Sequence, residues 1–339
     1  MKPVISVVIP CYNEVNYIVG CVESIINNGF DSEQLEIIVV DGGSTDGTIQ
    51  KLEDLKTKYR QVAFLKNPER ITPVSMNMGI HAANGHYLLI SSAHASFSTG
   101  YLTELKGLIE NTENTIAVGG VMQTLVKNSH VVSESIRTVL MHPVGVGNAK
   151  FRTGVGKVME VDTVPFGLYR ADVLKESGGY NTRLVRNHDM ELSKRLMATS
   201  GGKILLTPNA VCNYFARENY KAMARNNFNN GKWNLKTVWI TRTFSSLSLR
   251  HFIPMLFLLS WLSPILLGII VQDLRWSFLS LFILCTYVLS LSYFSFKALN
   301  GKNRWINVLL AFVLLHFAYG LGSMVGLMTL PLTQRNAKS

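Results

Sequence analysis

Side chains that can bind polar ligands, hold metal ions or move protons gather at a few places in this sequence. Three of these places, residues 12–14, 41–46 and 92–94, each follow directly after a short apolar run. They supply carboxylates, hydroxyls and an imidazole, which are hydrogen-bonding groups, metal ligands and acid–base groups. A further carboxylate, Asp189, lies much later in the chain, next to His188. We therefore expect a polar site assembled from distant parts of the chain.

The elements that must position these residues alternate between strand and helix. Short apolar runs, rich in β-branched residues, predict buried strands at residues 4–9, 36–40, 62–65 and 86–90. Between them, apolar residues at helical spacing predict helices that begin near residues 18, 48 and 72. This alternation predicts an α/β domain with a mostly parallel, Rossmann-like sheet and flanking helices. Ligands bind such sheets at the carboxyl ends of the strands, so the three polar segments should meet in one crevice.

The pattern changes after the fourth predicted strand. Strand-like pieces at residues 116–125, 161–169 and 203–207 surround a glycine-rich stretch, and a helix is expected from about Asp189 to Thr199. We interpret this part as the second half of the same domain. The predicted domain therefore covers residues 1–216.

Several segments together resemble the inverting family 2 glycosyltransferases with the GT-A fold. The resemblance is carried by VVIPCYNE (7–14), IVVDGGSTDGT (38–48), NMGI (77–80), ANG (83–85), GVG (145–147), FR (151–152), VDTVPFG (161–167) and NHDMEL (187–192). The first two motifs together are highly specific. The late segment HFAYGLG (316–322) is similar to one subgroup, the succinoglycan-type exopolysaccharide glycosyltransferases. The resemblance thus covers nearly the whole chain.

The resemblance implies a nucleotide diphosphate-sugar donor, most simply a UDP-sugar. It assigns six residues to the nucleotide-sugar: Pro10, Tyr12, Glu14, Asp41, Asp46 and Ser92. Asp41 would accept the imide hydrogen of the base, and Glu14 would bond the base or the ribose. Each of the three acids also has a simpler alternative. Asp41 could be a plain turn aspartate, Asp46 could serve only as a cap of the following helix, and Glu14 could belong only to a helix start.

The resemblance also implies a divalent metal, manganese or magnesium, on the diphosphate. The family holds it with a carboxylate-x-carboxylate pair after the fourth strand, where this chain has Ser92-Ala93-His94. His94 can bind such an ion through its imidazole, and Ser92 can bond a ribose hydroxyl. Arg70, Arg137 and Arg152 are possible diphosphate partners, among which the sequence does not choose.

Asp189 matches the family's catalytic base. An inverting transfer needs a carboxylate beside the acceptor hydroxyl, opposite the leaving diphosphate. His188 replaces the first acid of the usual pair and is expected to contact the acceptor or support Asp189. The alternative is that Asp189 only starts a helix, where a carboxylate is favourable.

Two further residues are candidates for binding the acceptor. Lys232 and Trp233 loosely match a segment that processive family members carry near their first membrane helix. Trp233 could stack on an acceptor sugar, or equally it could anchor the chain at a membrane interface. Because the match is loose, we expect single-sugar addition rather than processive synthesis.

Charge and hydropathy indicate a membrane rather than a nucleic acid as the partner surface. The formal net charge is +11, and basic residues crowd into residues 217–250, just before three apolar runs at 252–271, 276–296 and 305–330. Each run is long enough to cross a bilayer, so residues 251–331 should form about three transmembrane helices. The basic segment and a basic second link place the catalytic domain in the cytoplasm. None of the four cysteines is at metal-ligand spacing.

The sequence thus predicts a transferase at the bacterial inner membrane. It would add one sugar to a polyprenyl-diphosphate-linked oligosaccharide in surface or exopolysaccharide biosynthesis. Two alternatives stay open at this point. Ser92 and His188 depart from the family pattern and would suit an inactive nucleotide-sugar-binding partner subunit. A processive polysaccharide synthase is the other.

Overall fold

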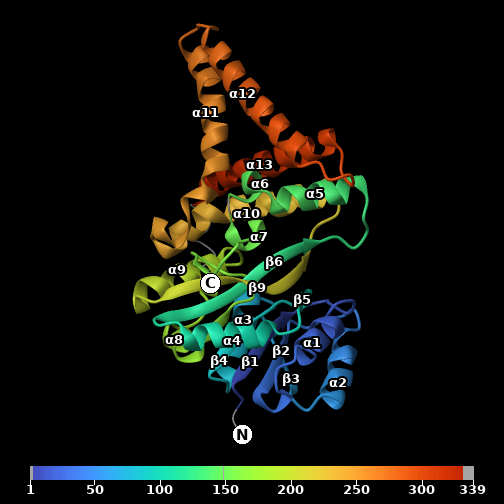
Figure 1. The fold of residues 1–339 in the computed structure, drawn as a ribbon. Coiled ribbons are helices and arrows are strands. Elements are labelled where there is room, and N and C mark those ends of the chain that lie inside the picture. The colour runs from blue at the N-terminus through green and yellow to red at the C-terminus, as the bar shows by residue number, and fades with distance from the viewer. Residues whose placement is uncertain (1–2, 148, 331–339) are drawn as a thin grey trace. The chain divides into compact units, whose positions relative to one another are not determined.

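The computed structural model describes residues 3–147 and 149–330 (Figure 1). The chain divides into two compact units. Unit 1 comprises residues 1–123 and 150–215, and unit 2 comprises residues 124–149 and 216–339. Residue 331, the predicted end of the membrane region, lies outside the described residues.

Four parallel strands form the first half of the sheet in unit 1. They are β1 (Ile5–Cys11), β2 (Leu35–Asp41), β3 (Val62–Lys66) and β4 (Tyr87–Ile90), in the order β3-β2-β1-β4. The helices α1 (Ile18–Ile26), α2 (Thr48–Lys58) and α3 (Thr72–Ala82) connect them. All four predicted strands and the three predicted helix starts therefore appear in the structure.

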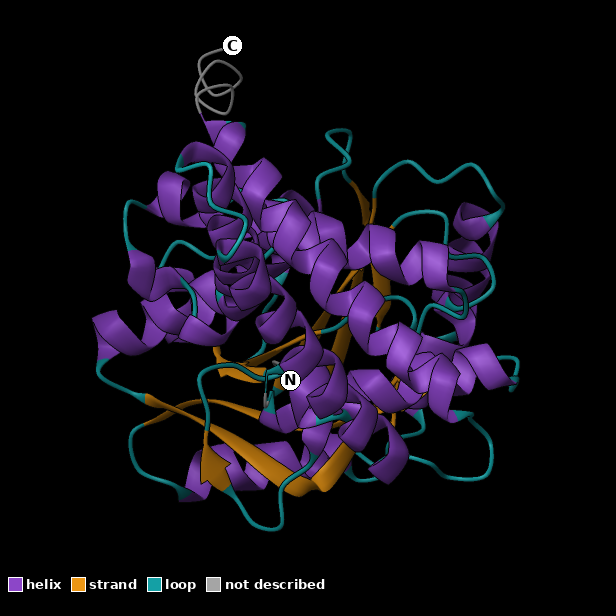
Figure 2. Ribbon diagram, turned by 90° about the horizontal axis from the view of Figure 1, so that it is seen from above, coloured by secondary structure: helices purple, strands orange, loops and turns teal. Residues whose placement is uncertain are grey.

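Antiparallel strands complete the sheet beyond β4. They are β5 (Ala95–Phe97), β6 (Thr115–Leu125), β7 (Met159–Glu160), β8 (Leu168–Arg170) and β9 (Lys203–Phe215). The described strands make one nine-stranded sheet, ordered β3-β2-β1-β4-β8-β6-β9-β5 with β7 on β9. Figure 2 distinguishes these strands from the helices around them. The predicted α/β fold class is confirmed, and the sheet is mixed, because only its first four strands are parallel.

The core of unit 1 consists of two apolar layers, one on each face of the sheet. Successive side chains of a strand point to opposite faces, so Val7 and Ile9 belong to one layer and Val8 to the other. The first layer includes apolar residues of α1, α2 and α4 (Tyr101–Asn111), and the second includes those of α3, α8 (Ala171–Glu176) and α9 (His188–Ser200). This packing holds the loops at the strand ends in place.

Unit 2 combines an internal segment with the C-terminal helices. Its helices are α5 (Val131–Met141), α6 (Pro143–Val146), α10 (Tyr220–Thr241), α11 (Ile253–Ile270), α12 (Trp276–Lys297) and α13 (Trp305–Met328). Ile136 and Val139 of α5 share one apolar cluster with Val308 and Phe312 of α13. Residues 124–149 therefore belong with the C-terminal helices, whereas the sequence placed them in the catalytic domain.

Among the described residues, α11, α12 and α13 are long and apolar enough to cross a membrane. Their bounds lie within two residues of the three predicted apolar runs.

Candidate active site

The loops that follow β1 and β2 are bonded to each other. The two strands are in register, with Cys11 beside Asp41. Beyond them, the Asn13 amide donates to Ser44 Oγ at 2.8 Å, and the Thr45 amide donates to Asn13 Oδ1 at 2.8 Å. The Glu14 amide also donates to Thr48 Oγ1 at 2.9 Å. Two motifs that lie 30 residues apart in the sequence are thus bonded to each other at the carboxyl end of the sheet. We call these two loops, residues 12–14 and 41–48, the ledge.

Asp41 orders the second loop of this ledge through hydrogen bonds to its own turn. Its side chain is buried, and its carboxylate accepts hydrogen bonds from the Gly43 amide at 2.8 Å, the Ser44 amide at 3.0 Å and Ser44 Oγ at 2.5 Å. Gly43 has a positive φ of 80°, which favours glycine. What the structure shows for Asp41 is the ordering of the turn, and its predicted contact with a base stays a prediction.

Replacing Ser44 with alanine should loosen the ledge. The change removes one bond to a buried carboxylate and leaves the Asn13 amide without its acceptor, which costs about 1–3 kcal/mol. We expect a lower melting temperature of the full-length protein in detergent and weaker binding of UDP. Thr45→Ala is the matched control, because Thr45 is exposed and bonds the ledge only through its backbone. Equal behaviour of the two variants would contradict this role of Ser44.

Asp46 behaves as a cap of α2. Its Oδ1 accepts from the Thr48 hydroxyl at 2.6 Å and the Thr48 amide at 3.1 Å, and its Oδ2 accepts from the Val15 amide at 3.2 Å. The hydrogen bond from the Thr48 hydroxyl lowers the pKa of Asp46. The capping alternative thus describes what is observed, and any nucleotide contact of Asp46 stays a prediction.

Tyr12 and Pro10 lie beside the same ledge. Pro10 is paired with Val40 in the sheet, and Tyr12 is 47% exposed. The guanidinium of Arg70 lies 5.8 Å from the centre of the Tyr12 ring. The two side chains therefore offer an aromatic face and a cation next to the ledge.

Glu14, Ser92 and His94 come together from two of the polar segments. His94 Nδ1 lies 3.2 Å from Glu14 Oε1, and Ser92 Oγ lies 3.3 Å from the His94 ring nitrogens. The side chains of His94 and Glu14 are 35% and 22% exposed, so a ligand can reach both. The predicted convergence of these residues is observed.

This cluster offers two ligands for a metal ion, not a complete site. Two atoms about 2.1 Å from one octahedral ion lie about 3 Å apart, and the Glu14–His94 separation of 3.2 Å fits that spacing. In the described part of the chain, no group of three or more His, Cys, Asp or Glu side chains is placed to hold a metal. An ion here would need further ligands from a diphosphate and water.

The guanidinium of Arg152 lies beyond His94, next to the ring of Tyr214. The His94 ring is 6.0 Å from that of Tyr214 at the end of β9, and the Arg152 guanidinium is 5.2 Å from the Tyr214 ring. Arg152 Nη1 is buried and has no hydrogen-bond partner among the described residues. Burial lowers the pKa of Arg152. Such an unpaired cation is costly unless it meets an anion.

Of the three candidate arginines, Arg70 lies beside Tyr12 at the loops that follow β1 and β2. Arg152 joins the His94 cluster through Tyr214, whereas Arg137 pairs with Glu134 in unit 2 at 2.8 Å. Sequence reasoning missed Tyr214. The only signal for it was its place at the end of an apolar strand.

Asp189 lies in the first turn of α9, with its side chain 60% exposed. The helix begins after Asn187, whose φ of 61° is left-handed. Ser193, one turn further on, bonds Thr163 at 3.1 Å, so Asp189 shares the helix face that looks toward residues 163–167. Gly167 in turn bonds the amide of Ile90 at the carboxyl end of β4. These contacts link α9 to the segment that ends beside β4, and the position of the Asp189 side chain relative to the nucleotide-binding loops stays a prediction.

His188 supports the region around Asp189. Its Nε2 is 3.6 Å from Asp189 Oδ1, and its ring packs against Tyr180 at 5.6 Å. Its Nδ1 is buried and has no hydrogen-bond partner within the described ranges. Burial, with the Asp189 charge as a second cause, raises the pKa of Tyr180 well above its usual value.

Lys232 and Trp233 belong to α10 of unit 2. The Lys236 ammonium lies 5.5 Å from the Trp233 ring. Their predicted contact with an acceptor stays a prediction.

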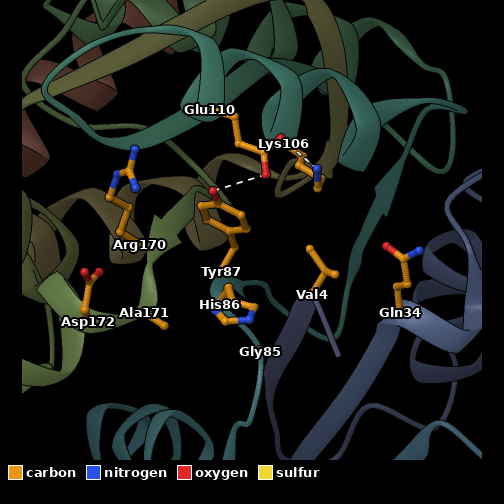
Figure 3. Close-up of a pocket in the computed structure, with 10 residues that line it drawn as sticks. All are labelled: Val4, Gln34, Gly85, His86, Tyr87, Lys106, Glu110, Arg170, Ala171 and Asp172. Atoms are coloured by element: carbon orange, nitrogen blue, oxygen red, sulfur yellow. Dashed lines mark hydrogen bonds and ion pairs between the residues drawn. The ribbon is translucent and has the colours of Figure 1, made fainter. Parts of the chain in front are cut away.

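A separate pocket lies at the opposite end of the sheet (Figure 3). It has a volume of about 490 Å³ and is lined by residues from the amino ends of β1 and β4, from α4 and from the start of α8. Its polar groups are engaged: Tyr87 donates to Glu110 at 3.2 Å, and Arg170 donates to the Thr115 carbonyl at 2.9 Å. It contains none of the predicted site residues.

Comparisons with known proteins agree with this geometry. A family model described as "Glycosyl transferase family 2" matches residues 6–178. A dolichyl N-acetyl-alpha-D-glucosaminyl phosphate 3-beta-D-2,3-diacetamido-2,3-dideoxy-beta-D-glucuronosyltransferase of Methanococcus voltae is 28% identical over 274 residues, or 79% of this chain and 83% of the relative. Succinoglycan biosynthesis protein ExoA of Rhizobium meliloti is 27% identical over 278 residues, or 80% and 78%. Because it is one of several relatives, the predicted subgroup is not established.

A solved structure shares the fold. GalNAc-T7 in complex with UDP, GalNAc and Mn²⁺ matches with a TM-score of 0.50 and 17% identity, over 64% of this chain and 44% of that chain. At this identity the likeness concerns the fold alone.

Proposed function

The chain belongs to glycosyl transferase family 2, and we propose that it transfers a single sugar, with inversion, from a UDP-sugar to a polyprenyl-diphosphate-linked oligosaccharide. The observation that carries the proposal is the convergence at one end of the sheet. There the loops that follow β1 and β2 are bonded to each other, and Glu14 of the first loop lies next to His94. The His94 ring lies near Tyr214, which in turn contacts the guanidinium of Arg152. Acceptors for a nucleoside and a cation for a diphosphate are thus supplied together.

The donor half of the site would work as follows. The ledge binds the nucleoside through Tyr12, Glu14 and the loop of Asp41, and Ser92 bonds a ribose hydroxyl. Arg152 provides positive charge for the diphosphate, whose negative charge grows as the bond to the sugar breaks. GalNAc-T7, which has the same fold, was solved with UDP.

A divalent metal, Mn²⁺ or Mg²⁺, would be held by His94 and Glu14 together with the diphosphate. When bound, such an ion neutralises charge on the leaving group. The 3.2 Å spacing of the two ligand atoms supports this assignment. Ser92 stands where the family has a carboxylate, so Arg152 carries more of the charge stabilisation here.

Asp189 would act as the base. An exposed carboxylate in the first turn of α9 can accept the proton of the acceptor hydroxyl while the hydroxyl oxygen attacks the anomeric carbon. His188 holds the chain around it through its packing on Tyr180.

The acceptor is proposed to be a lipid-linked glycan of surface or exopolysaccharide biosynthesis, of the succinoglycan type. The Methanococcus voltae relative is named for a dolichyl phosphate-linked substrate, and helices long and apolar enough to cross a membrane support a membrane location. Lys232 and Trp233 would contact the acceptor. The catalytic domain would face the cytoplasm at a bacterial inner membrane, because basic residues crowd into 217–250.

A second candidate is a nucleotide-sugar-binding partner subunit without turnover, which Ser92 and His188 favour. A processive synthase is less well supported, because the match around Trp233 is loose.

The test is a donor panel with purified full-length protein. The protein is incubated with UDP-, GDP- and dTDP-sugars and an undecaprenyl-diphosphate-linked oligosaccharide, with Mn²⁺, with Mg²⁺ or with chelator. We expect one UDP-sugar to give a product longer by one residue. Products longer by many residues would support a processive synthase. Binding of UDP without any product would favour the partner subunit.

The same assay tests the metal ligands. His94→Ala should raise the Mn²⁺ concentration needed for half-maximal activity by about tenfold or more. His81→Ala is the control, because His81 is exposed in the last turn of α3. Full activity of the parent in chelator would remove the metal from the mechanism and leave the transfer itself intact.

A further inference from the structure

The helix α13 is packed tightly along α10 within unit 2. A Cβ atom on Gly231 of α10 would lie 1.9 Å from the Tyr319 carbonyl oxygen, and one on Gly322 of α13 would lie 2.0 Å from the Phe228 carbonyl oxygen. Near the first residues of both helices, Tyr220 donates to the Asn307 carbonyl at 3.1 Å. Near the end of α13, Gly326 meets the backbone of Lys232 in the middle of α10. The two helices therefore run parallel and in contact for most of the length of α13.

The partner helix α10 is polar. It carries four cations, Lys221, Arg225, Lys232 and Lys236, and also five asparagines, at 226, 227, 229, 230 and 234. If α13 crossed the bilayer, α10 would have to cross beside it. Cations and amides would then lie in the hydrocarbon, where charged side chains are costly and rare.

The helix α13 is also held from another side. Its first half packs on α5, which carries the Glu134–Arg137 ion pair. At its middle, His316 Nε2 donates to the Val144 carbonyl of α6 at 2.9 Å. A spanning α13 would bring His142 and the turn after the four-residue helix α6 to the depth of the bilayer centre, where irregular backbone is not exposed to lipid.

The helices α11 and α12 are different. The base of their hairpin packs on α13, where Leu258 meets Gly320 and the Tyr287 hydroxyl lies 3.1 Å from His316 Nδ1. The tip of the hairpin extends away from α5, α10 and α13, as Figure 1 shows. They have 18 and 22 residues, which corresponds to about 27 and 33 Å. The link at the tip holds the exposed Asp273–Arg275 ion pair at 2.8 Å, and the only charged residue within the two helices is the terminal Lys297. This hairpin fits a bilayer crossed twice.

We propose that the chain crosses the membrane twice, through α11 and α12, and that α13 lies in the headgroup layer together with α10. Leu310, Leu321 and Met328 are exposed and share one face of α13, which would rest on the acyl chains. The cations of α10 would contact anionic lipid headgroups. This inference rests on the proposed membrane location, and it puts both ends of the hairpin and the end of α13 on one side.

Cysteine labelling tests the topology in the full chain. Cys285→Ser gives the background, because Cys285 is the one exposed thiol; Cys11, Cys21 and Cys212 are buried. Burial also raises the pKa of Cys21 and Cys212 to about 12. Single cysteines are introduced as Leu274→Cys at the hairpin tip, Lys302→Cys after α12 and Ser339→Cys, and sealed vesicles of one orientation are treated with a membrane-impermeant maleimide.

We expect Lys302→Cys and Ser339→Cys to react from the same side and Leu274→Cys from the opposite side. Labelling of Ser339→Cys together with Leu274→Cys would overturn the inference, because α13 would then cross. Release of the protein by a carbonate wash would instead refute the membrane location on which the inference rests.

Depth measurements give a second, independent readout. Nitroxide spin labels are attached at Leu310→Cys, Leu321→Cys and Met328→Cys in vesicles of phosphatidylethanolamine and phosphatidylglycerol. The depth of each label is obtained from its relative accessibility to oxygen and to a nickel chelate. An in-plane α13 places all three at one shallow depth. A spanning α13 separates the first from the last by about 27 Å. Leu259→Cys and Ile270→Cys, on one face of α11, are the control pair and should differ by about 16 Å.

Discussion

Asp189→Asn should lower the rate of sugar transfer by about 10²–10⁴-fold and leave UDP binding unchanged. The substitution keeps the size of the side chain and removes its ability to take the acceptor proton. Because the side chain is 60% exposed in the first turn of α9, the protein should remain folded. The measurement compares the turnover number with the dissociation constant for UDP.

Asp172→Asn is the matched control. Asp172 is also an aspartate in the first turn of a helix of unit 1, but it lines the pocket at the opposite end of the sheet. It should retain the activity of the parent. Unchanged transfer by Asp189→Asn would remove this residue from the reaction, and loss of UDP binding would assign it a role in the fold instead.

Arg152→Met is expected to have the second largest effect. Methionine fills a similar volume between the rings of Phe151 and Tyr214 but carries no charge. If the guanidinium stabilises the departing diphosphate, kcat should fall by about 10²–10³-fold. The KM for the donor should also rise, since the ground-state diphosphate loses the same cation.

Stability separates this role from a structural one. Arg152 Nη1 has no hydrogen-bond partner in the described structure, so removing the charge should not lower the melting temperature. Arg137→Met is the comparison, because it breaks the Glu134 pair in unit 2 and should destabilise the protein. A folded, fully active Arg152→Met variant would contradict the proposed contact with the diphosphate.

The local features of the fold could be read from the sequence. The apolar runs predicted at residues 4–9 and 36–40 form the largely buried strands β1 and β2, and residue type and spacing suffice to recognise them. The loops after β1 and β2 had to lie together, because parallel neighbours in a sheet end at the same edge. The convergence of Glu14 with His94 follows from the same rule.

The roles of single residues within those loops were harder to predict. Asp46 bonds Thr48 at the start of α2 and Asp41 orders its own turn, and the sequence left both of these alternatives open. A carboxylate at a strand end can bond its own backbone or a ligand, and only the positions of neighbouring donors distinguish the two.

Contacts between distant segments required the tertiary structure. Residues 124–149 belong to unit 2 and pack with the C-terminal helices, because the apolar face of α5 is completed by α13, as where Ile136 shares a cluster with Val308. The position of Arg152 beside the His94 cluster depends on Tyr214, which comes from a distant strand. Hydropathy does not distinguish α13 from α11 and α12, since it counts only the residues within each helix. The polar neighbours of α13 come from α5 and α10, and packing alone brings them together.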